Sequence, residues 1–266
     1  MADTTAEQAV ERVITLMREN LDEQLTVDDM ARTAMFSKFH FSRMFQRVTG
    51  VSPGRFLSAL RLEQAKRLLI STSYNVSDIS LRVGYTSVGT FSSRFTRSVG
   101  LSPTTYRRQR GVTAEIRTGT PGYATGAPHA MVSGIIRHSR PSPRRRLIFA
   151  GLFRDRIPEG SPVACAVLRE PGPFLIERVP PGMWYLLMHS VPKGAEATRN
   201  DDQTEVATCG PIAVRPGAAI EGCDALLQPA RRLDPPVLLA LLDVRTAALE
   251  ETAALEETAA LEVALG

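Results

Sequence analysis

The chain has 266 residues, 43% of them hydrophobic, and a formal net charge of +4. This length allows one large domain or two ordinary domains, and we expect two. No apolar run approaches the ~20 residues that a membrane helix requires, which excludes a membrane-spanning protein. The first residues, MADTTAEQAVERV, are acidic where a signal peptide is basic, so the sequence predicts a cytoplasmic protein.

Charge is divided unevenly along the chain. Residues 1–110 hold 16 basic and 10 acidic side chains, and residues 111–146 hold 6 and 1. Residues 147–243 hold 9 basic and 12 acidic side chains, and residues 244–266 hold 1 and 5. A basic first part followed by an acidic second part indicates a polyanion-binding domain joined to a domain of another kind.

Residues 1–110 predict short helices separated by turns. A capping box from Thr26 to Asp29 begins one of them. The string FSRMFQRVTGVSP at 41–53 then returns as FSSRFTRSVGLSP at 91–103, with seven of the thirteen positions identical. In each copy the two phenylalanines lie one helical turn apart, which predicts a helix with one buried face. Glycine ends that helix and Ser-Pro begins the next, which in the first copy is a longer helix.

A short helix followed by one that presents polar side chains outward is typical of a helix-turn-helix DNA-binding unit. In the first copy, Arg43 can form paired hydrogen bonds to guanine, Ser42 can bond to a base edge and Arg47 can reach a phosphate. The alternative for one such helix alone is a solvated surface without a ligand. Two copies in one basic domain favour DNA binding.

The stretches LTVDDMARTAMFSKFHFSRMFQRVTGVSPGRFL and RLEQAKRLLISTSYNVSDISLRVGYTSVGTFSSRFTRSVGLSPTTYRR resemble the AraC/XylS-type transcription regulators, over roughly residues 8–110. The resemblance implies two helix-turn-helix units bridged by one long helix, about residues 54–70. It also implies that recognition helices at about 37–48 and 87–98 enter adjacent major-groove segments ~34 Å apart on one side of the DNA.

The resemblance further implies which residues contact DNA bases. In the second unit this chain departs from the family's common pattern, because small side chains stand where long amides or an arginine are frequent. We therefore expect Arg43 to carry most of the direct readout. The implied base-contacting residues are Phe39, Ser42, Arg43, Val88, Gly89, Thr90 and Ser93. Phosphate contacts are assigned to Lys38, Arg47, Arg94, Arg97, Thr105 and Arg107.

Residues 111–146 are rich in Gly, Pro, Thr, Ser and Arg, which predicts a linker. From Leu147 onward, apolar runs alternate with Pro/Gly turns, which predicts strands. Their spacing favours a β-sandwich-like domain over 147–233. The pattern of strands and turns over 147–230 also resembles a carboxypeptidase-regulatory or transthyretin-like module. Its most distinctive motif is VPPGMWYLLMHSV. The expected fold class is therefore multidomain α plus β, with an all-α double helix-turn-helix domain first.

The second domain leaves three interpretations open. A small-molecule sensor requires a pocket, an interaction or dimerisation module requires only an exposed surface, and an enzyme requires a catalytic cluster. An enzyme is not expected, because the histidines are scattered and no GxSxG or HExxH motif is present. The candidate pocket residues are Trp184, Tyr185, Met188 and His189, although alternate strand positions such as 184 and 188 are also typical of a core.

No metal or cofactor is expected from the cysteines. Cys165, Cys209 and Cys223 are widely spaced and form no CxxC pair, so they are interpreted as small, partly buried hydrophobic residues, with a redox switch or metal site as the alternative.

Residues 234–266 predict a C-terminal helix that continues into three TAALE hexads. Six residues turn a helix by ~600°, so the hexad leucines do not form a coiled-coil seam. A solvated tail is expected, with dimerisation through 237–244 as the alternative.

Together these patterns predict a bacterial, cytoplasmic, nucleoid-associated and sequence-specific transcription regulator that binds double-stranded DNA at a promoter or operator. RNA polymerase, a small-molecule effector and a second copy of the chain, bound through the C-terminal domain or helix, are further candidate partners. One alternative is a weakly specific nucleoid-associated DNA binder that multimerises through its β-rich domain. Another is that this domain is an anti-activator arm that binds a partner protein.

Overall fold

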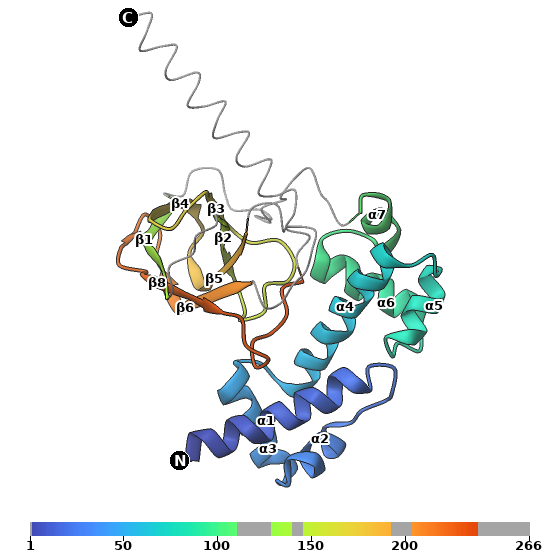
Figure 1. Ribbon diagram of the computed structural model, residues 1–266. Helices are drawn as coiled ribbons and strands as arrows, with labels where there is room; N and C mark the ends of the chain where they lie inside the picture. Colours follow the sequence, from blue (N-terminus) through green and yellow to red (C-terminus); the bar gives the residue numbers. More distant parts are fainter. Residues whose placement is uncertain (1, 111–128, 140–145, 193–203, 239–266) are drawn as a thin grey trace, which may run out of the picture. The chain divides into compact units, whose positions relative to one another are not determined.

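The computed structural model describes residues 2–110, 129–139, 146–192 and 204–238. Two compact units make up the chain, one helical and one rich in strands (Figure 1). The predicted order of an α-helical part followed by a β-rich part is confirmed. The helical unit comprises Met1–Gly111, Arg156–Gly160 and Arg231–Leu239, and the strand-rich unit comprises Val112–Asp155, Ser161–Ala230 and Ala240–Gly266.

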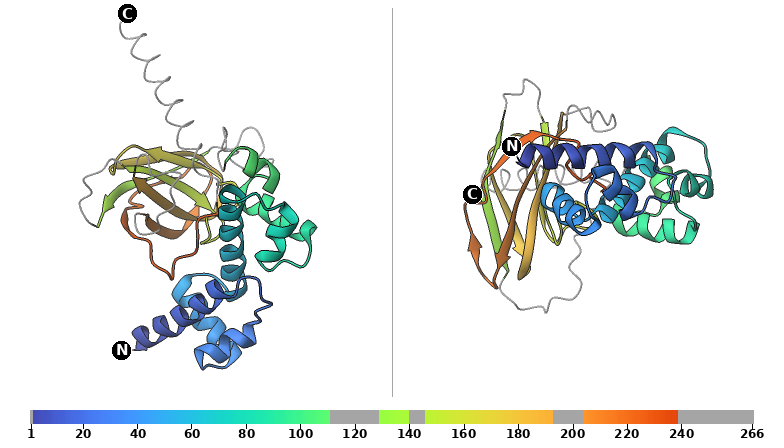
Figure 2. Two further views of the ribbon diagram at one scale, coloured as in Figure 1. Left: turned by 45° about the vertical axis from the view of Figure 1, so that its right-hand side comes forward. Right: turned by 90° about the horizontal axis from the view of Figure 1, so that it is seen from below.

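Within the helical unit, the long helix α4 connects two groups of shorter helices, as predicted. Helices α1 to α3 gather at one end of α4, and α5 to α7 pack around its other end (Figure 2). The helices are α1 (Ala2–Glu19), α2 (Val27–Ala34), α3 (Lys38–Thr49), α4 (Pro53–Ser71), α5 (Val76–Arg82), α6 (Val88–Val99) and α7 (Pro103–Arg108).

The repeated string builds the same aromatic core twice. In the first copy, the ring centroids of Phe41 and Phe45 are 5.6 Å apart, and those of Phe45 and Phe56 are 5.5 Å apart. All three rings are fully buried, and edge-to-face contacts of this kind stabilise a core beyond the area that they bury. The repeat therefore encodes packing between the recognition helix and the helix after it. The same contacts recur among Phe91, Phe95 and Tyr106.

Left-handed backbone conformations occur at the turns and helix ends of both helix-turn-helix units. Gly50 ends α3 with φ 81°, and Gly100 ends α6 with φ 90°. The turn before each recognition helix also contains such a residue, which is Gly84 in the second unit and Met35 in the first. Glycine adopts this conformation without a steric penalty, so Met35 is the unusual member of the set.

The described strands form one sheet with the order β3-β2-β5-β6-β8-β1-β4, while β7 pairs with β1. Because β3 and β4 also contact each other, the sheet is nearly closed. The strand-rich prediction is confirmed. The two-sheet sandwich and the resemblance to a carboxypeptidase-regulatory module are not. The strands are β1 (Ala130–His138), β2 (Arg146–Phe153), β3 (Cys165–Leu168), β4 (Pro173–Val179), β5 (Gly182–Pro192), β6 (Glu205–Val214), β7 (Ala219–Ile220) and β8 (Ala225–Pro229).

The predicted linker at 111–146 is wrong over 130–138, because these residues form β1. Val132 and Ile136 of this strand are buried in the core of the sheet. Gly134 lies against the backbone of Cys223, where an added Cβ would be 2.6 Å from the carbonyl carbon. The partners of β1 are distant in sequence, so the local composition gave no sign of this strand.

The predicted C-terminal helix does not begin at Asp234. Residues 231–234 form a turn, in which the Arg231 amide donates to the Asp234 carboxylate, and residues 235–238 have no regular secondary structure. Proline disfavours the helical conformation in the residue that precedes it, and Pro235 and Pro236 follow this turn. The remaining residues, 239–266 with the hexads, lie outside the described residues.

All three cysteines are free thiols. Burial is the largest cause that raises the pKa of Cys165 and of Cys223, to about 11 in each case. Cys223 is buried, whereas Cys165 and Cys209 are half-buried. Among the described residues, no cluster of three or more metal-binding side chains occurs, and no helix is long and apolar enough to cross a membrane.

Candidate nucleic-acid interface

An exposed stripe on α3 contains the main groups predicted to read DNA. Phe39, Arg43 and Arg47 are spaced by four residues, so they lie along one face of the helix. Phe39 is 81% exposed, which is unusual for a phenylalanine, and both arginines are exposed. Within the described part of the chain, neither arginine forms a hydrogen bond or an ion pair. These side chains are thus available to a ligand.

The corresponding stripe on α6 carries smaller side chains. Gly89, Ser93 and Arg97 occupy the positions fifty residues after Phe39, Arg43 and Arg47, and all three are exposed. Both stripes end in arginine, but the second replaces the phenylalanine and the first arginine with glycine and serine.

Neither recognition helix contains a carboxylate. The sequences KFHFSRMFQRVT of α3 and VGTFSSRFTRSV of α6 carry only basic charges. A phosphate backbone would therefore meet no repulsive charge on either helix.

The other predicted base-contacting residues differ in exposure. Ser42 is half-buried, and its hydroxyl donates to the Lys38 carbonyl at 2.8 Å. Val88 is 38% exposed, and Thr90 is exposed at the start of α6, where its backbone N–H donates to the Ser87 hydroxyl at 3.3 Å. Val88 and Thr90 are thus open at the start of α6, whereas the Ser42 hydroxyl is already engaged.

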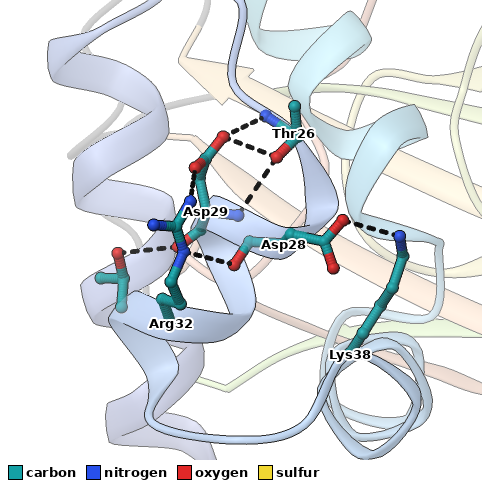
Figure 3. A network of polar contacts seen from close by, with 6 residues as sticks. Thr26, Asp28, Asp29, Arg32 and Lys38 are labelled. Carbon is teal, nitrogen blue, oxygen red and sulfur yellow. Dashed lines mark hydrogen bonds and ion pairs between the residues drawn. The ribbon is translucent and has the colours of Figure 1, made fainter.

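A polar network fixes the start of α2 and reaches Lys38 at the start of α3 (Figure 3). The Asp29 backbone N–H donates to the Thr26 hydroxyl at 3.2 Å, and the Thr26 backbone N–H donates to the Asp29 carboxylate at 2.9 Å. This is the predicted capping box, which is confirmed. Lys38 forms an ion pair with Asp28 at 2.7 Å. Because both side chains are about half exposed, this pair is weak, and Lys38 can exchange Asp28 for a phosphate at little cost.

Thr26→Val should raise the pKa of Asp29 toward its ordinary value. The hydrogen bond from the Thr26 side chain is the largest cause of the lowered pKa of this carboxyl, followed by the bond from the Thr26 backbone. The lowered pKa means that Asp29 stabilises the fold above about pH 4, its unfolded value, and that this contribution is lost as the pH falls through the folded pKa. Carboxyl NMR titration measures the shift. Thr33→Val is the control, since Thr33 bonds the Asp29 carbonyl instead, and an unmoved pKa in Thr26→Val would contradict the assignment.

Besides Lys38, three of the predicted phosphate contacts are engaged within the protein. Arg107 is half-buried and donates to the backbone carbonyls of Leu69, at 3.0 Å, and Tyr74. The Thr105 hydroxyl accepts a hydrogen bond from the Ser102 hydroxyl at the start of α7. Arg94 is exposed, but it lies within 3.4 Å of Ser58 on α4. The Arg47 and Arg97 side chains form no hydrogen bond or ion pair among the described residues, and Lys38 is held only by its exposed pair with Asp28.

Sequence reasoning missed Met35 as a surface residue. It precedes α3 in the left-handed conformation with φ 61° and is 82% exposed. Together with Phe39 it places two large exposed apolar side chains near the start of α3. An apolar residue between two predicted helices is usually expected to be buried, so the sequence gave no signal that Met35 is exposed.

The four candidate pocket residues of β5 do not share one face. Trp184 and Met188 belong to the core of the sheet, and the Trp184 indole N–H donates to the Pro180 carbonyl at 2.8 Å. Tyr185 and His189 are half-buried and project from the opposite face, because successive strand residues alternate. The four residues are therefore divided between two faces of the sheet, and an effector pocket at these residues stays a prediction.

Two helix-turn-helix units with exposed, carboxylate-free recognition helices define a DNA-binding domain. A family model described as "Helix-turn-helix domain" matches residues 30–109. The lactose operon transcription activator of Staphylococcus xylosus is 33% identical over 98 residues, which are 37% of this chain and 35% of that protein. The HTH-type transcriptional activator AarP of Providencia stuartii is 30% identical over 98 residues, which are 73% of its length.

Among solved structures, the DNA-binding domain of AdpA in complex with a target DNA is 34% identical, with a TM-score of 0.36. That match covers 37% of this chain and 89% of the other. The chain belongs to the AraC/XylS-type transcription regulators, and residues 30–109 are its DNA-binding domain of that type. It spans about a third of the length of the lactose operon activator.

Proposed function

We propose that this protein is a sequence-specific transcription regulator that places α3 and α6 in adjacent major-groove segments of DNA. The observation that carries the proposal is the pair of exposed, carboxylate-free stripes, 39–43–47 and 89–93–97, on helices packed at the two ends of α4. A major groove accepts an α-helix, and two grooves on one side of a duplex repeat every ~34 Å.

The two stripes support a division of roles. The exposed guanidinium of Arg43 suits paired hydrogen bonds to guanine, and the exposed ring of Phe39 suits contact with a thymine methyl group. On α6, Gly89 and Ser93 allow close approach to the duplex but offer few reading groups. The first unit then supplies most of the base discrimination, while Val88, Thr90 and Ser93 contribute methyl packing and weaker hydrogen bonds.

Arg47→Ala and Arg107→Ala should have different effects, although both residues are basic. Loss of a phosphate contact at Arg47 should weaken binding to all sequences alike and reduce the salt slope by about 0.9. Arg107→Ala should instead lower the thermal stability, because it leaves the Leu69 and Tyr74 carbonyls without this donor. Fluorescence titrations at several salt concentrations, with melting curves for both variants, measure the difference. An equal salt-slope change in the two variants would contradict these assignments.

For the strand-rich unit we propose effector sensing or self-association. Its net acidic composition supports a role apart from DNA binding. RNA polymerase remains a candidate partner, and the expected location is the bacterial nucleoid. Sedimentation of the full chain over a range of concentrations distinguishes self-association from a monomeric sensor.

The function is tested by the ratio of specific to bulk DNA affinity. The full-length protein is used to select a duplex from a random pool, and its affinity is then compared with that for bulk DNA at one salt concentration. A sequence-specific regulator predicts a preference of ~10³-fold or more. A preference of only a few-fold would support the alternative, a weakly specific nucleoid-associated binder.

A further inference from the structure

Two short segments from the second half of the chain are built into the helical unit. Residues 156–160 follow β2 in the sequence, and residues 231–239 follow β8. They contribute the buried side chains of Ile157, Leu233 and Leu238, with exposures of 1%, 3% and 0%. Both segments thus place buried side chains in the helical unit.

Glu159 joins the two helix-turn-helix units through both of its carboxylate oxygens. One oxygen lies 2.7 Å from the Arg55 guanidinium at the start of α4, directly after the first recognition helix. The other accepts a hydrogen bond at 3.0 Å from the Ser98 hydroxyl near the end of α6. The Gly160 backbone N–H adds a bond of 2.8 Å to the Ser98 carbonyl. One side chain thus links the region after α3 to the last turn of α6.

The same segment also meets the end of α3 itself. An added Cβ at Gly50 would lie 2.5 Å from the Cδ of Arg156, so the arginine side chain passes directly over this helix end. Residues 156–160 therefore contact the C-terminal ends of both recognition helices.

Residues 231–238 contact both segment 156–160 and helix α4. The Leu238 backbone N–H donates to the Pro158 carbonyl at 3.2 Å. The Lys66 ammonium, which is only 2% exposed, donates to the Leu238 carbonyl at 2.7 Å and to the Val237 carbonyl at 3.3 Å. Because a buried ammonium requires such acceptors, Lys66 anchors the second segment to α4.

A separate set of contacts connects the two helix-turn-helix units through the loop between α1 and α2. Arg61 of α4 donates to the Leu21 carbonyl at 2.9 Å, and the Gln24 amide donates to the Gly84 carbonyl at 3.1 Å. The two recognition helices are therefore connected in two places besides α4, and Glu159 supplies one of them.

We propose that Glu159 is a positioning residue that sets the separation and relative rotation of α3 and α6 on DNA. The inference rests on the proposed function. Each added base pair shifts a half-site by ~3.4 Å and rotates it about the duplex axis, so a rigid protein tolerates only one spacing. Without Glu159, the two helix-turn-helix units remain joined by α4, by the loop between α1 and α2, and by the Arg156 and Gly160 contacts of segment 156–160, but they should accept a wider range of spacings.

The test uses the full chain and the duplex that the wild type selects from a random pool. The affinity ratio between this duplex and one with a single base pair inserted between the half-sites is measured for the wild type, Glu159→Ala and Glu159→Gln. Glu159→Ala should lower the ratio by about three- to tenfold, the range for a partly exposed ion pair with a hydrogen bond. Glu159→Gln should lower it less, because its amide oxygen still accepts from Ser98.

Glu177→Ala, at an exposed position of β4, is the matched control and should leave the ratio unchanged. Hydrogen exchange without DNA provides a readout that does not depend on the function: Glu159→Ala should speed exchange in residues 50–56 and 97–100. If the wild type selects no site, the proposed function fails, and the exchange result alone decides the positioning role. A folded Glu159→Ala variant with unchanged exchange, or with the wild-type ratio on a selected site, overturns the inference.

Discussion

Gly84→Ala should strongly destabilise the helical unit, whereas Gly100→Ala should cost much less. Both glycines are left-handed, with φ 78° and 90°, so alanine costs about 1 to 2 kcal/mol of backbone strain at either position. At Gly84 the added Cβ would also overlap the Leu21 carbonyl and lie 2.6 Å from the Arg61 guanidinium, whereas at Gly100 nothing lies within 4 Å. Displacement of this packed backbone adds about 1 to 3 kcal/mol.

Urea unfolding followed by far-UV circular dichroism measures this difference in the free energy of unfolding. Gly100→Ala is the matched control, because it carries the same backbone strain without the steric overlap. Equal losses in the two variants would mean that the loop between α1 and α2 does not pack against the second helix-turn-helix turn.

Arg43→Ala should remove most of the base preference at one position of the binding site. A bidentate arginine–guanine contact contributes about 1 to 3 kcal/mol of discrimination, or roughly a 5- to 150-fold preference. Ser93→Ala, at the matching position of α6, should change the preference much less, because a serine hydroxyl can donate to or accept from several bases. Binding-site selection with sequencing of the bound pool measures both effects.

Arg47→Ala is the control for the loss of charge on α3. It should weaken binding without changing the preferred sequence, since phosphate contacts carry no base information. If Ser93→Ala relaxed the base preference as much as Arg43→Ala, the assignment of the main readout to the first unit would be contradicted.

Local signals in the sequence were sufficient for the helices at 27–108. The Thr26 capping box, the paired phenylalanines and the Ser-Pro starts act over three or four residues, so their spacing specifies the helices directly. The exposed stripe on α3 followed from the same periodicity, because a buried phenylalanine face leaves the opposite face in solvent.

Contacts between distant parts of the chain could not be predicted from the sequence. Strand β1 forms because 130–138 pairs with β4, β7 and β8, whereas the Gly-, Pro- and Ser-rich residues on both sides of it resemble a linker. From the sequence alone, Arg107 was predicted to contact phosphate, because its carbonyl acceptors at Leu69 and Tyr74 are more than 30 residues away. Glu159 and Lys66 likewise gave no signal, because Glu159 is 104 residues from Arg55 and Lys66 is 172 residues from Leu238.

Guanine N7 methylation protection on the selected duplex tests the central claim most directly. Two recognition helices in adjacent major grooves predict two clusters of protected guanines on one face of the DNA, about 10 base pairs apart. Arg43→Ala should abolish protection in one cluster and retain the other. A single protected cluster, or two clusters on opposite faces of the duplex, would contradict two-site recognition by α3 and α6.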